Sequence, residues 1–253
     1  MPFDYCMETG LIMRLLDLSY ADPCRNLALD EVLLEGVAAG SAPDTLRFWE
    51  SPAVFVVIGS SQQVHLAVHE SNCLCDGVPI LRRCSAGGAV LQGPGSLNFA
   101  LALSYEHFPE TAFLHASYDF ILGSVTAALH RLGMRVGRQG ISDLAIGGMK
   151  CSGNAQRRKR NACLHHGTLL YRVEPGLMGR YLQEPEDRPD YRGVRSHDEF
   201  VQAAAVAPAR LREVIREAFC PEAVPETLLP AEEADVERLV LEKYSSREWN
   251  YRR

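Results

Sequence analysis

Apolar residues recur along the chain with two different periods, and each period predicts one kind of element. Helical spacing runs through residues 25–37 and 118–132, and Gly133 follows the second run in the position favoured after a helix. Towards the C-terminus the same spacing predicts a helix from about Pro208 and another over about 232–243. The chain is therefore expected to contain these four helices.

Strands are expected where apolar residues run continuously or alternate. Residues 53–58 are continuously apolar and stop at a glycine, which predicts a strand buried on both faces. Shorter or alternating patterns predict strands over 79–83, 96–104 and 163–171. A glycine-rich turn separates the strand at 79–83 from the strand at 96–104, and residues 185–195 are expected to form a charged, proline-bearing loop.

Composition and charge exclude several classes of protein. The 253 residues are 47% hydrophobic and 23% charged, which is ordinary globular composition, and we expect one domain over residues 1–253. A net charge of −6 argues against a chain-wide attraction to nucleic acid or anionic lipid. No apolar run approaches the roughly 18 residues that cross a bilayer, and Met1–Tyr5 lacks the positive charge of a secretory signal. A cytoplasmic protein without a membrane or nucleic-acid partner is expected.

The cysteines predict free thiols and no zinc site. Eight cysteines are too sparse for a disulfide scaffold in a chain of 253 residues. Cys73 and Cys75 are separated by one residue, and no second pair completes a set of zinc ligands. Metal chemistry based on cysteine is therefore not expected.

The glycine-rich turn is the first candidate ligand site. It brings Arg82 and Arg83 close to Gly87 and Gly88. Because glycine has no Cβ, main-chain N–H groups in such a turn can approach an anionic ligand closely. The alternative is a hairpin turn in which the glycines only supply the backbone conformation.

The second candidate is a loop around Lys150. This lysine is flanked by glycines and can act as a mobile charge on a phosphate or a developing oxyanion, although most lysines are simply solvated. Residues 137–166 carry six basic side chains against one acid, so one face of the protein is expected to be locally basic. His165 and His166 follow, and adjacent residues of a strand face opposite ways, so at most one of them can point into a given pocket.

Taken together, these segments resemble the lipoate-protein ligase family, within the wider group of biotin/lipoate ligases and octanoyltransferases. The resemblance rests on six segments in order: Asn26–Glu31, Leu46–Trp49, Val57–Gln62, Arg82–Val90 with Gly95–Asn98, Asp143–Leu144 with Lys150–Gln156, and His165–Leu170. The segment Tyr244–Tyr251 also looks like the end of that family's catalytic domain.

The resemblance implies an α/β (α+β) fold in which mixed β-sheets are flanked by helices, similar to the catalytic cores of biotin ligases. It implies a two-step reaction. Lipoate and ATP with Mg²⁺ would form lipoyl-AMP and pyrophosphate, and the lipoyl group would then pass to a lysine of a small acceptor domain. Many relatives carry an accessory C-terminal domain, which is expected to be absent here and replaced by a separately encoded accessory subunit.

The resemblance also implies roles for particular residues. Lys150 would be the catalytic residue, steadying the charge of the acyl-adenylate. Asp143 would help place the nucleotide or bind Mg²⁺. The other expected substrate and nucleotide contacts are Arg83, Ser85, Gly87, Gly88, Ala89, Val90, Asn98, Ser152, Gly153, Ala155, His166 and Gly167. The basic run Arg157–Arg160 is expected either to dock an acidic acceptor domain or to be a solvated loop.

Two departures and three alternatives accompany this interpretation. Ala86 stands where the family usually has a third glycine, and Ser142 precedes Asp143 in place of asparagine. An octanoyl- or lipoyl-transferase with a cysteine thioester is the nearest alternative, because Cys84 and Cys151 lie in the relevant segments, but residues 137–150 lack the cysteine expected there. A biotin ligase is less favoured because its Gly-Arg-Gly-Arg turn is missing. A lipoate-binding module without turnover is the third alternative.

Overall fold

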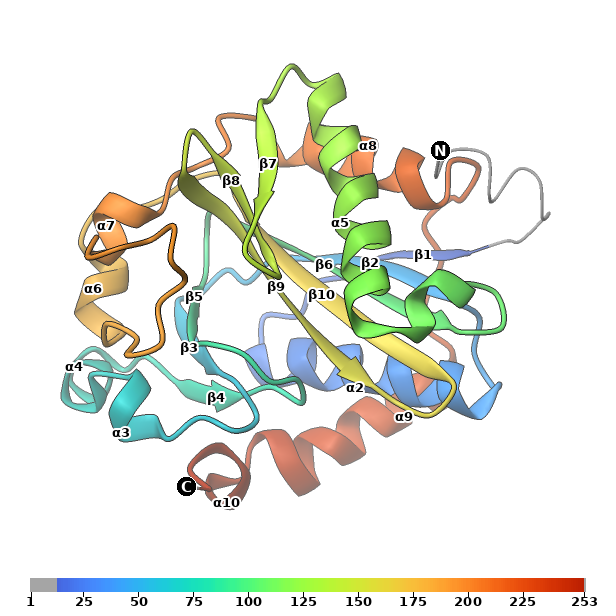
Figure 1. The fold of residues 1–253 in the computed structure, drawn as a ribbon. Helices are drawn as coiled ribbons and strands as arrows, with labels where there is room; N and C mark the ends of the chain where they lie inside the picture. The colour runs from blue at the N-terminus through green and yellow to red at the C-terminus, as the bar shows by residue number, and fades with distance from the viewer. Residues whose placement is uncertain (1–12, 253) are drawn as a thin grey trace.

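The structure, a computed structural model, describes residues 13–252 (Figure 1). The predicted absence of a leader at Met1–Tyr5 and the thiol of Cys6 lie outside the described residues. None of the helices within residues 13–252 combines the length and apolar character that crossing a membrane requires. Each of the seven cysteines in this range is free, as expected.

Two β-sheets form the framework. The large sheet has seven strands in the order β1-β2-β6-β10-β9-β8-β7, and all neighbours are antiparallel except β1 and β2. Its strands are β1 (Arg14–Asp17), β2 (Thr45–Trp49), β6 (Ser96–Ser104), β7 (Val136–Gln139), β8 (Asp143–Ile146), β9 (Met149–Arg158) and β10 (Ala162–Leu170). The small sheet has the order β4-β3-β5 and consists of β3 (Phe55–Ile58), β4 (Ile80–Arg82) and β5 (Val90–Gln92).

Helices cover both faces of the large sheet (Figure 1). The main ones are α2 (Pro23–Ala39), α5 (Leu114–Arg131), α8 (Pro208–Phe219) and α9 (Pro230–Leu239), which continues into the π-helical turn η3 (Val240–Tyr244). The short ones are α3 (Val64–Ala67), α4 (Glu70–Asp76), η2 (Pro109–Ala112), α6 (Leu177–Tyr181), α7 (His197–Phe200) and α10 (Arg247–Asn250). The expected mixture of sheets flanked by helices is confirmed.

Strand β6 shows how the two faces are packed. Its bulky residues at 97, 99, 101 and 103 face α5 and α8, whereas Ala100 and Ala102 face α2. Because successive side chains of a strand point to opposite faces, the leucine/alanine alternation gives one face volume and lets α2 lie close to the other. The alternation that predicted this strand therefore belongs to an element buried on both sides, not to one with a solvated face.

The predicted helices and strands are present with small shifts in their ends. Residues 25–37 lie in α2, which begins at Pro23, where Asp22 accepts a hydrogen bond from the backbone N–H of Cys24 at 2.9 Å. Residues 118–131 lie in α5, Leu132 caps its C-terminus, and Gly133 adopts a left-handed conformation (φ 77°) just after it, as expected. Residues 53–58 form the fully buried strand β3. The last predicted helix is divided between α9 and η3.

The segment around Lys150, predicted as a loop, is a strand. Residues 149–158 form β9, which pairs with β8 on one side and β10 on the other. The prediction was wrong because polar residues and a glycine fill this strand and hide its period, and the two neighbouring strands supply the pairing that stabilises it. The basic run Arg157–Arg160 is correspondingly the end of β9 and its turn into β10.

Candidate functional site

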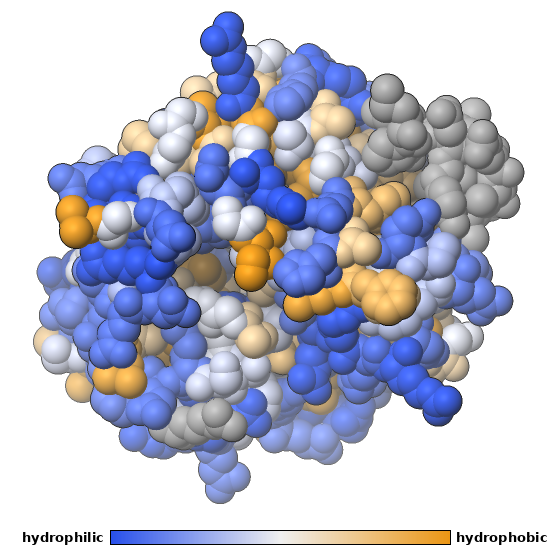
Figure 2. Space-filling model, in the orientation of Figure 1, coloured by the Kyte–Doolittle hydropathy of each residue, from blue (hydrophilic) through white to orange (hydrophobic). Residues whose placement is uncertain are grey.

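The glycine turn lies directly against strand β9, so the two predicted ligand segments form one site. Gly87 has a left-handed backbone (φ +104°), and a Cβ placed on it would lie 3.8 Å from Cβ of Ala155 and 2.8 Å from Nη2 of Arg83. On the opposite side, a Cβ on Gly59 would lie 2.0 Å from the carbonyl oxygen of Gly87. A side chain at Gly59 would therefore meet the backbone of the turn and one at Gly87 would meet Arg83, whereas a Cβ on Gly88 would have no neighbour within 4 Å. The molecular surface is hollowed between the small sheet and the β8–β9 side of the large sheet (Figure 2).

A β-bulge determines where Lys150 points. Leu144 pairs with Ser152 and Ala145 pairs with Lys150, so Cys151 is an extra residue in β9. A bulge shifts the alternation of a strand by one residue. Lys150 consequently lies on the same face as Gly153, and a Cβ on Gly153 would be only 2.9 Å from Cε of Lys150. Gly153 is thus required for the lysine to lie across the strand.

The Lys150 ammonium group is held by a single carboxylate. Its Nζ lies 2.7 Å from Oδ1 of Asp143, and the lysine side chain is 26% exposed. Oδ2 of the same carboxylate accepts a hydrogen bond from the hydroxyl of Tyr191 at 2.8 Å. Burial and the negative charge of Asp143 raise the pKa of Tyr191, so the phenol stays protonated and donates. Lys150 is therefore neither a solvated surface lysine nor a freely mobile charge.

Tyr191 belongs to the predicted charged loop, which covers the β8–β9 hairpin. The backbone N–H of Gln202 donates to the carbonyl oxygen of Lys150 at 2.9 Å, and Arg195 Nη1 donates to that of Gly148 at 3.0 Å. The Tyr191 ring packs on Phe200 with a centroid distance of 5.1 Å. Sequence analysis did not identify Tyr191, since its only local signal is its place in a loop of mixed charge.

The surroundings of Asp143 do not fit a magnesium ion held by the protein. Both carboxylate oxygens already accept, one from an ammonium group whose charge repels a cation. No group of three or more His, Cys, Asp or Glu side chains that could hold a metal occurs within residues 13–252. Mg²⁺ sites usually combine one or two carboxylates with waters and substrate phosphates. Asp143 acts in this arrangement as the partner of Lys150.

Arg83 is a buried cation without a carboxylate partner among the described residues. It is 7% exposed, and its Nε and Nη2 donate to Oγ of Ser85 at 3.0 Å and to the carbonyl oxygen of Ala86 at 2.7 Å. Burial lowers the pKa of Arg83 to about 10, so the guanidinium is still charged at neutral pH. A buried charge is costly unless it is paired. This position therefore suits an anionic ligand.

The tip of the turn offers further donors. Ala86, Gly87 and Gly88 are exposed, and their backbone N–H groups donate no hydrogen bond to any of residues 13–252. Ala89 and Val90 are half-buried and pack against apolar clusters below the turn. Free N–H groups beside a buried guanidinium form a concave donor set of the kind that binds carboxylates and phosphates.

Arg82, by contrast, is a structural residue. Its guanidinium is fully buried and donates to the carbonyl oxygens of Gly59, Gln62, Trp249 and Asn250 at 2.7–3.1 Å. The indole N–H of Trp249 donates back to the carbonyl oxygen of Arg82 at 2.7 Å. Arg82 thus holds α10 against the small sheet, whereas Arg83 is available to the candidate site.

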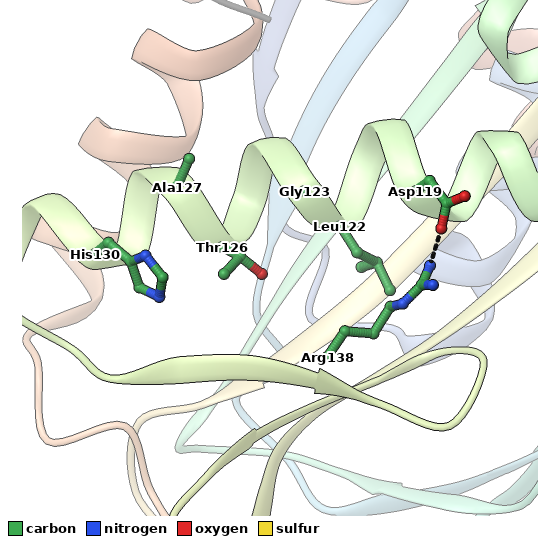
Figure 3. Close-up of a pocket in the computed structure, with 7 residues that line it drawn as sticks. All are labelled: Asp119, Leu122, Gly123, Thr126, Ala127, His130 and Arg138. Atoms are coloured by element: carbon green, nitrogen blue, oxygen red, sulfur yellow. Dashed lines mark ion pairs between the residues drawn. The ribbon is translucent and has the colours of Figure 1, made fainter. Parts of the chain in front are cut away.

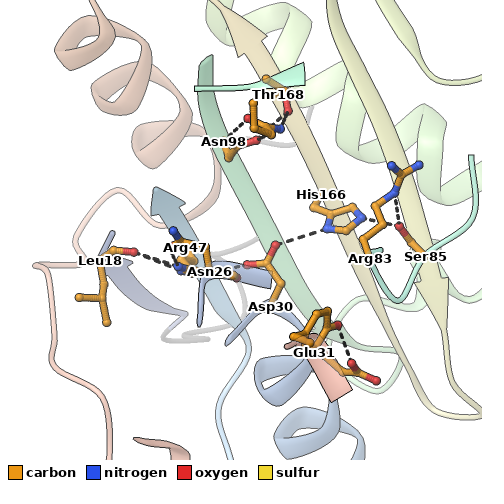
Figure 4. Close-up of polar contacts among 12 residues, drawn as sticks. Leu18, Asn26, Asp30, Glu31, Arg47, Arg83, Ser85, Asn98, His166 and Thr168 are labelled. Carbon is orange, nitrogen blue, oxygen red and sulfur yellow. Dashed lines mark hydrogen bonds and ion pairs between the residues drawn. The ribbon is translucent and has the colours of Figure 1, made fainter. Parts of the chain in front are cut away.

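His166 faces the glycine turn, and His165 faces away from it, as the strand alternation predicts. Nε2 of His166 lies 2.6 Å from Oγ of Ser85, and Nδ1 lies 3.3 Å from Oδ2 of Asp30 on α2 (Figure 4). His165 is fully buried against Phe99 on the α5 face. Burial lowers the pKa of His165 to about 3, so it is a neutral core residue.

Asp30 was not predicted as a site residue, although it lies in the first of the six family-like segments. Its Oδ1 accepts from Nη1 of the fully buried Arg47 at 2.6 Å. Only the fold brings this pair next to His166, because α2, β2 and β10 are far apart in the sequence. The labelled side chains in Figure 4 show the resulting line of polar groups from Arg47 to Arg83.

Asn98 forms a closed network with two residues that sequence analysis did not single out. Its Oδ1 accepts from the Thr168 hydroxyl at 2.7 Å and from Nε2 of Gln92 at 2.8 Å, and its Nδ2 donates to Oε1 of Gln92 at 2.9 Å. Gln92 lies on β5, whereas Asn98 and Thr168 lie on paired strands of the large sheet. The network therefore joins the small sheet to the large one.

Two predicted contact residues lie on the other face of the large sheet. Ser152 is fully buried opposite Leu144 and Leu169, which belong to the core below α5. A Cβ on Gly167 would lie 2.6 Å from Cζ of Phe99 in the same core. The structure therefore does not bring the Ser152 side chain or the open side of Gly167 together with His166, Ala155 and Gly153.

A depression between α5 and β7 lies apart from this site (Figure 3). It has a volume of about 370 Å³, and the ion pair between Asp119 and Arg138 (2.5 Å) lies along it. None of the residues that line it comes from the glycine turn or from β9. We give it no part in the candidate site.

A protein-family model spans the residues that form this site. Residues 22–219 match the model of the lipoyl protein ligase A/B catalytic domain. The chain belongs to this family. Its members include enzymes of two kinds, lipoate-protein ligases and octanoyltransferases.

Both kinds of relative are similar to this lipoyl ligase-family protein at a comparable level. A lipoate-protein ligase A homologue from Aeropyrum pernix is 30% identical over 168 residues, which are 66% of this chain and 61% of that relative. Octanoyltransferase LipM from Kyrpidia tusciae is 27% identical over 274 residues, covering 95% of this chain and 98% of the relative. The chain thus spans about three fifths of the first relative and nearly all of the second.

Solved structures show the same fold. A bipartite lipoate protein ligase from Thermoplasma acidophilum, described with its E2 lipoyl domain, has a TM-score of 0.83 and 23% identity, covering 95% of this chain and 96% of its own. A lipoate-protein ligase A bound with ATP also has a TM-score of 0.83 and 23% identity, covering 95% and 99%. At this identity the comparison concerns the fold of the family's catalytic domain.

Proposed function

We propose that this protein activates lipoate with ATP to form lipoyl-AMP and then transfers the lipoyl group to a lysine of a lipoyl acceptor domain. The proposal rests on the placement of Lys150, which is held by one carboxylate on the face where Arg83 and the backbone N–H groups of the turn meet. Among residues 13–252, Arg83 has no carboxylate partner and these N–H groups have no acceptor. Two cationic side chains and a set of backbone donors fit a substrate that carries both a carboxylate and a phosphate.

In the first step, a carboxylate oxygen of lipoate attacks the α-phosphorus of ATP, and pyrophosphate leaves. Arg83 and the turn N–H groups would hold the carboxylate and offset the repulsion between the two anions. Magnesium would accompany the triphosphate and offset part of its charge. Because Asp143 does not fit a resident metal, we derive no step from a metal bound there.

In the second step, the acceptor amine attacks the acyl carbon and a C–N bond forms. AMP leaves with the electrons of the C–O bond, and the nitrogen releases one proton to solvent. Negative charge develops on the carbonyl oxygen before the bond breaks. Lys150 would donate to that oxygen or to the departing phosphate, in a site where the covering loop limits access of water. Asp143 would keep the ammonium group over Gly153 until the substrate replaces it as the partner.

Octanoyl transfer through a cysteine thioester is the second candidate, favoured by the nearly full-length similarity to LipM. This route needs an accessible thiolate. Burial raises the pKa of Cys84 to about 12 and that of Cys151 to about 11, and both side chains are buried. These two thiols are therefore poor nucleophiles, which supports the ligase.

The deciding experiment is the intact mass of a lipoyl acceptor domain after incubation with this protein. Lipoate with ATP should add one lipoyl group and release pyrophosphate, either with this chain alone or with a separate accessory subunit. An octanoyl donor without ATP should add nothing. Modification from the octanoyl donor alone would establish the transferase, and binding of lipoate without pyrophosphate release under any condition would establish a binding module.

Substituting both Cys84 and Cys151 also distinguishes the ligase reaction from acyl transfer through a cysteine thioester. Cys84→Ser with Cys151→Ser should retain lipoylation within about three-fold of the wild type, because the proposed ligase reaction uses neither thiol. A three-fold loss corresponds to less than about 1 kcal/mol of transition-state stabilisation. The folded fraction is checked by circular dichroism. Loss of acyl transfer in the folded double variant would move the assignment to a thioester mechanism.

The exposed arginines of the β9–β10 turn are proposed to dock the acceptor domain. Arg157 and Arg160 are exposed, whereas Arg158 and Lys159 are engaged with Thr111 and Glu35. Arg157 follows Ala155 by two residues on β9, so a domain bound there would lie beside the glycine turn. An acidic acceptor would be steered to this turn.

Charge reversal at both positions tests this docking. Arg157→Glu with Arg160→Glu should raise KM for an acidic acceptor about ten-fold at low salt, with little change in pyrophosphate release, because rim charges act mainly on association. The matched control is Arg135→Glu with Arg210→Glu, which makes the same charge change at exposed positions elsewhere. Equal effects of the two double variants would exclude a specific docking role.

A further inference from the structure

A continuous line of buried polar groups connects helix α2 to the glycine turn. It runs from Arg47 through Asp30, His166 and Ser85 to Arg83 (Figure 4). Asp30 is 2% exposed and Ser85 is fully buried. Polar groups at such depth are costly unless each donor finds an acceptor, so the direction of each hydrogen bond can be deduced.

The residues at the two ends of the line determine which atom donates and which accepts in each of its hydrogen bonds. Burial alone would raise the pKa of Asp30, but the Arg47 guanidinium and His166 outweigh this effect and hold the pKa below its usual value. Asp30 is therefore a carboxylate, which only accepts, so Nδ1 of His166 carries the proton. At the other end, Nε of Arg83 only donates, so Oγ of Ser85 accepts from it. In the neutral form of His166, Nε2 then carries no proton, so the Ser85 hydroxyl donates to it.

We infer that Asp30 and His166 are positioning residues that orient Arg83 for the acid substrate. Asp30 fixes the tautomer of His166, this tautomer fixes the direction of the Ser85 hydroxyl, and the hydroxyl oxygen anchors Nε of Arg83. The second anchor is the carbonyl oxygen of Ala86, which accepts from Nη2. Nη1 has no partner within residues 13–252 and is the group offered to the anion. The inference rests on the proposed function, since it names the group that binds the substrate carboxylate.

Ser85, His166 and Asp30 could also be interpreted as a nucleophile, a general base and an acid that orients the base. Two observations oppose that interpretation. Ser85 is fully buried, and its oxygen is already engaged by a guanidinium that would lower its nucleophilicity. The line therefore orients a binding group and forms no covalent intermediate.

Nuclear magnetic resonance of the histidine side-chain nitrogens tests the inference without an activity measurement. In the wild type, His166 should carry its proton on Nδ1. In Asp30→Asn the new amide can donate to Nδ1, so the proton should move to Nε2. The control is Arg47→Lys, which keeps a cation beside Asp30 and should leave the tautomer unchanged. An unchanged tautomer in folded Asp30→Asn would overturn the inference.

Substrate binding gives the second measurement. Asp30→Asn and Ser85→Ala should each raise KM for lipoate about ten-fold with a smaller change in kcat, because each loosens one buried hydrogen bond to a charged group. In Ser85→Ala the His166 tautomer should stay as in the wild type, because the contact between His166 and Asp30 is kept and only the contact with the Ser85 hydroxyl is lost. Ser85→Thr restores the hydroxyl and should recover most of the affinity.

The two measurements separate the inference from the proposed function. If the wild type releases no pyrophosphate with lipoate and ATP, the proposed function fails, while the tautomer of His166 still decides whether the line is directed as described. If lipoylation occurs and both Asp30→Asn and Ser85→Ala leave KM unchanged, only the positioning role fails. An acyl adduct on Ser85 in the intact mass would also overturn it. If Asp30→Asn does not fold, KM for lipoate in the Ser85 variants still decides whether the line orients Arg83.

Discussion

Replacing Lys150 with alanine should lower the rate of lipoyl transfer by about 10²–10³-fold, the usual effect of removing one preorganised donor from a developing oxyanion. The fall should appear in kcat more than in KM for lipoate, because the ammonium group acts where charge develops and Arg83 remains to bind the acid. Single-turnover lipoylation of an acceptor domain, started with synthetic lipoyl-AMP, measures this step directly.

The matched control for Lys150 is another lysine held by one carboxylate. Lys159 lies in the turn after β9, and its Nζ is 2.6 Å from Oε1 of Glu35. Lys159→Ala removes the same charge and a comparable ion pair. At saturating acceptor, where a loss of docking has no effect, it should leave transfer from lipoyl-AMP within about two-fold, since such half-exposed pairs contribute little. Equal losses in the two variants would remove Lys150 from its proposed role.

Replacing Arg83 with methionine should impair binding and stabilise the fold at the same time. Loss of a buried guanidinium that pairs with the substrate carboxylate should raise KM for lipoate by about 10²-fold, the scale of truncating one partner of a buried charge pair. Within residues 13–252 the same cation has no counter-ion, so an apolar side chain of similar length removes a desolvation cost. The melting temperature should therefore stay the same or rise.

Thermal unfolding with and without lipoate distinguishes the two effects of Arg83→Met. The wild type should gain stability from lipoate by mass action, and the variant should not. Arg82→Met is the contrasting variant, because that guanidinium is saturated by four backbone carbonyl oxygens and should be strongly destabilising when lost. A lower melting temperature in Arg83→Met would show that the bonds to Ser85 and Ala86 serve the fold instead of the ligand.

The elements that sequence patterns predict well are those whose own period reflects their burial. Strand β6 and helix α5 carry regular apolar spacing, and the structure has both within a few residues of the expected ends. Strand β9 has no such spacing, because its stability comes from the backbone pairing of β8 and β10. Ser152 and Gly167 were placed with the ligand contacts for the same reason: their face of the sheet follows from strand pairing that the sequence does not reveal.

The sequence pattern pointed to the glycines and the lysine of the candidate site, but not to the side chains from other elements that position them. Gly87 and Gly153 stand out because only their lack of a Cβ permits the close contacts observed. Tyr191 and Asp30 come from a loop and a helix far away in the sequence, and each acts through a side chain of another element. Burial decides the role of such residues, and burial is a property of the assembled sheets.

The extra residue at Cys151 makes the site sensitive to chain length. Inserting one residue between Leu144 and Ala145 of β8 would give Cys151 a partner and restore regular alternation to β9. The Lys150 side chain would then point towards the apolar interior beneath α5, and the Asp143 carboxylate would lose its partner. A designer who transplants the lysine to another scaffold must carry the irregularity along with it, because the placement of the charge depends on the count of residues as much as on their identity.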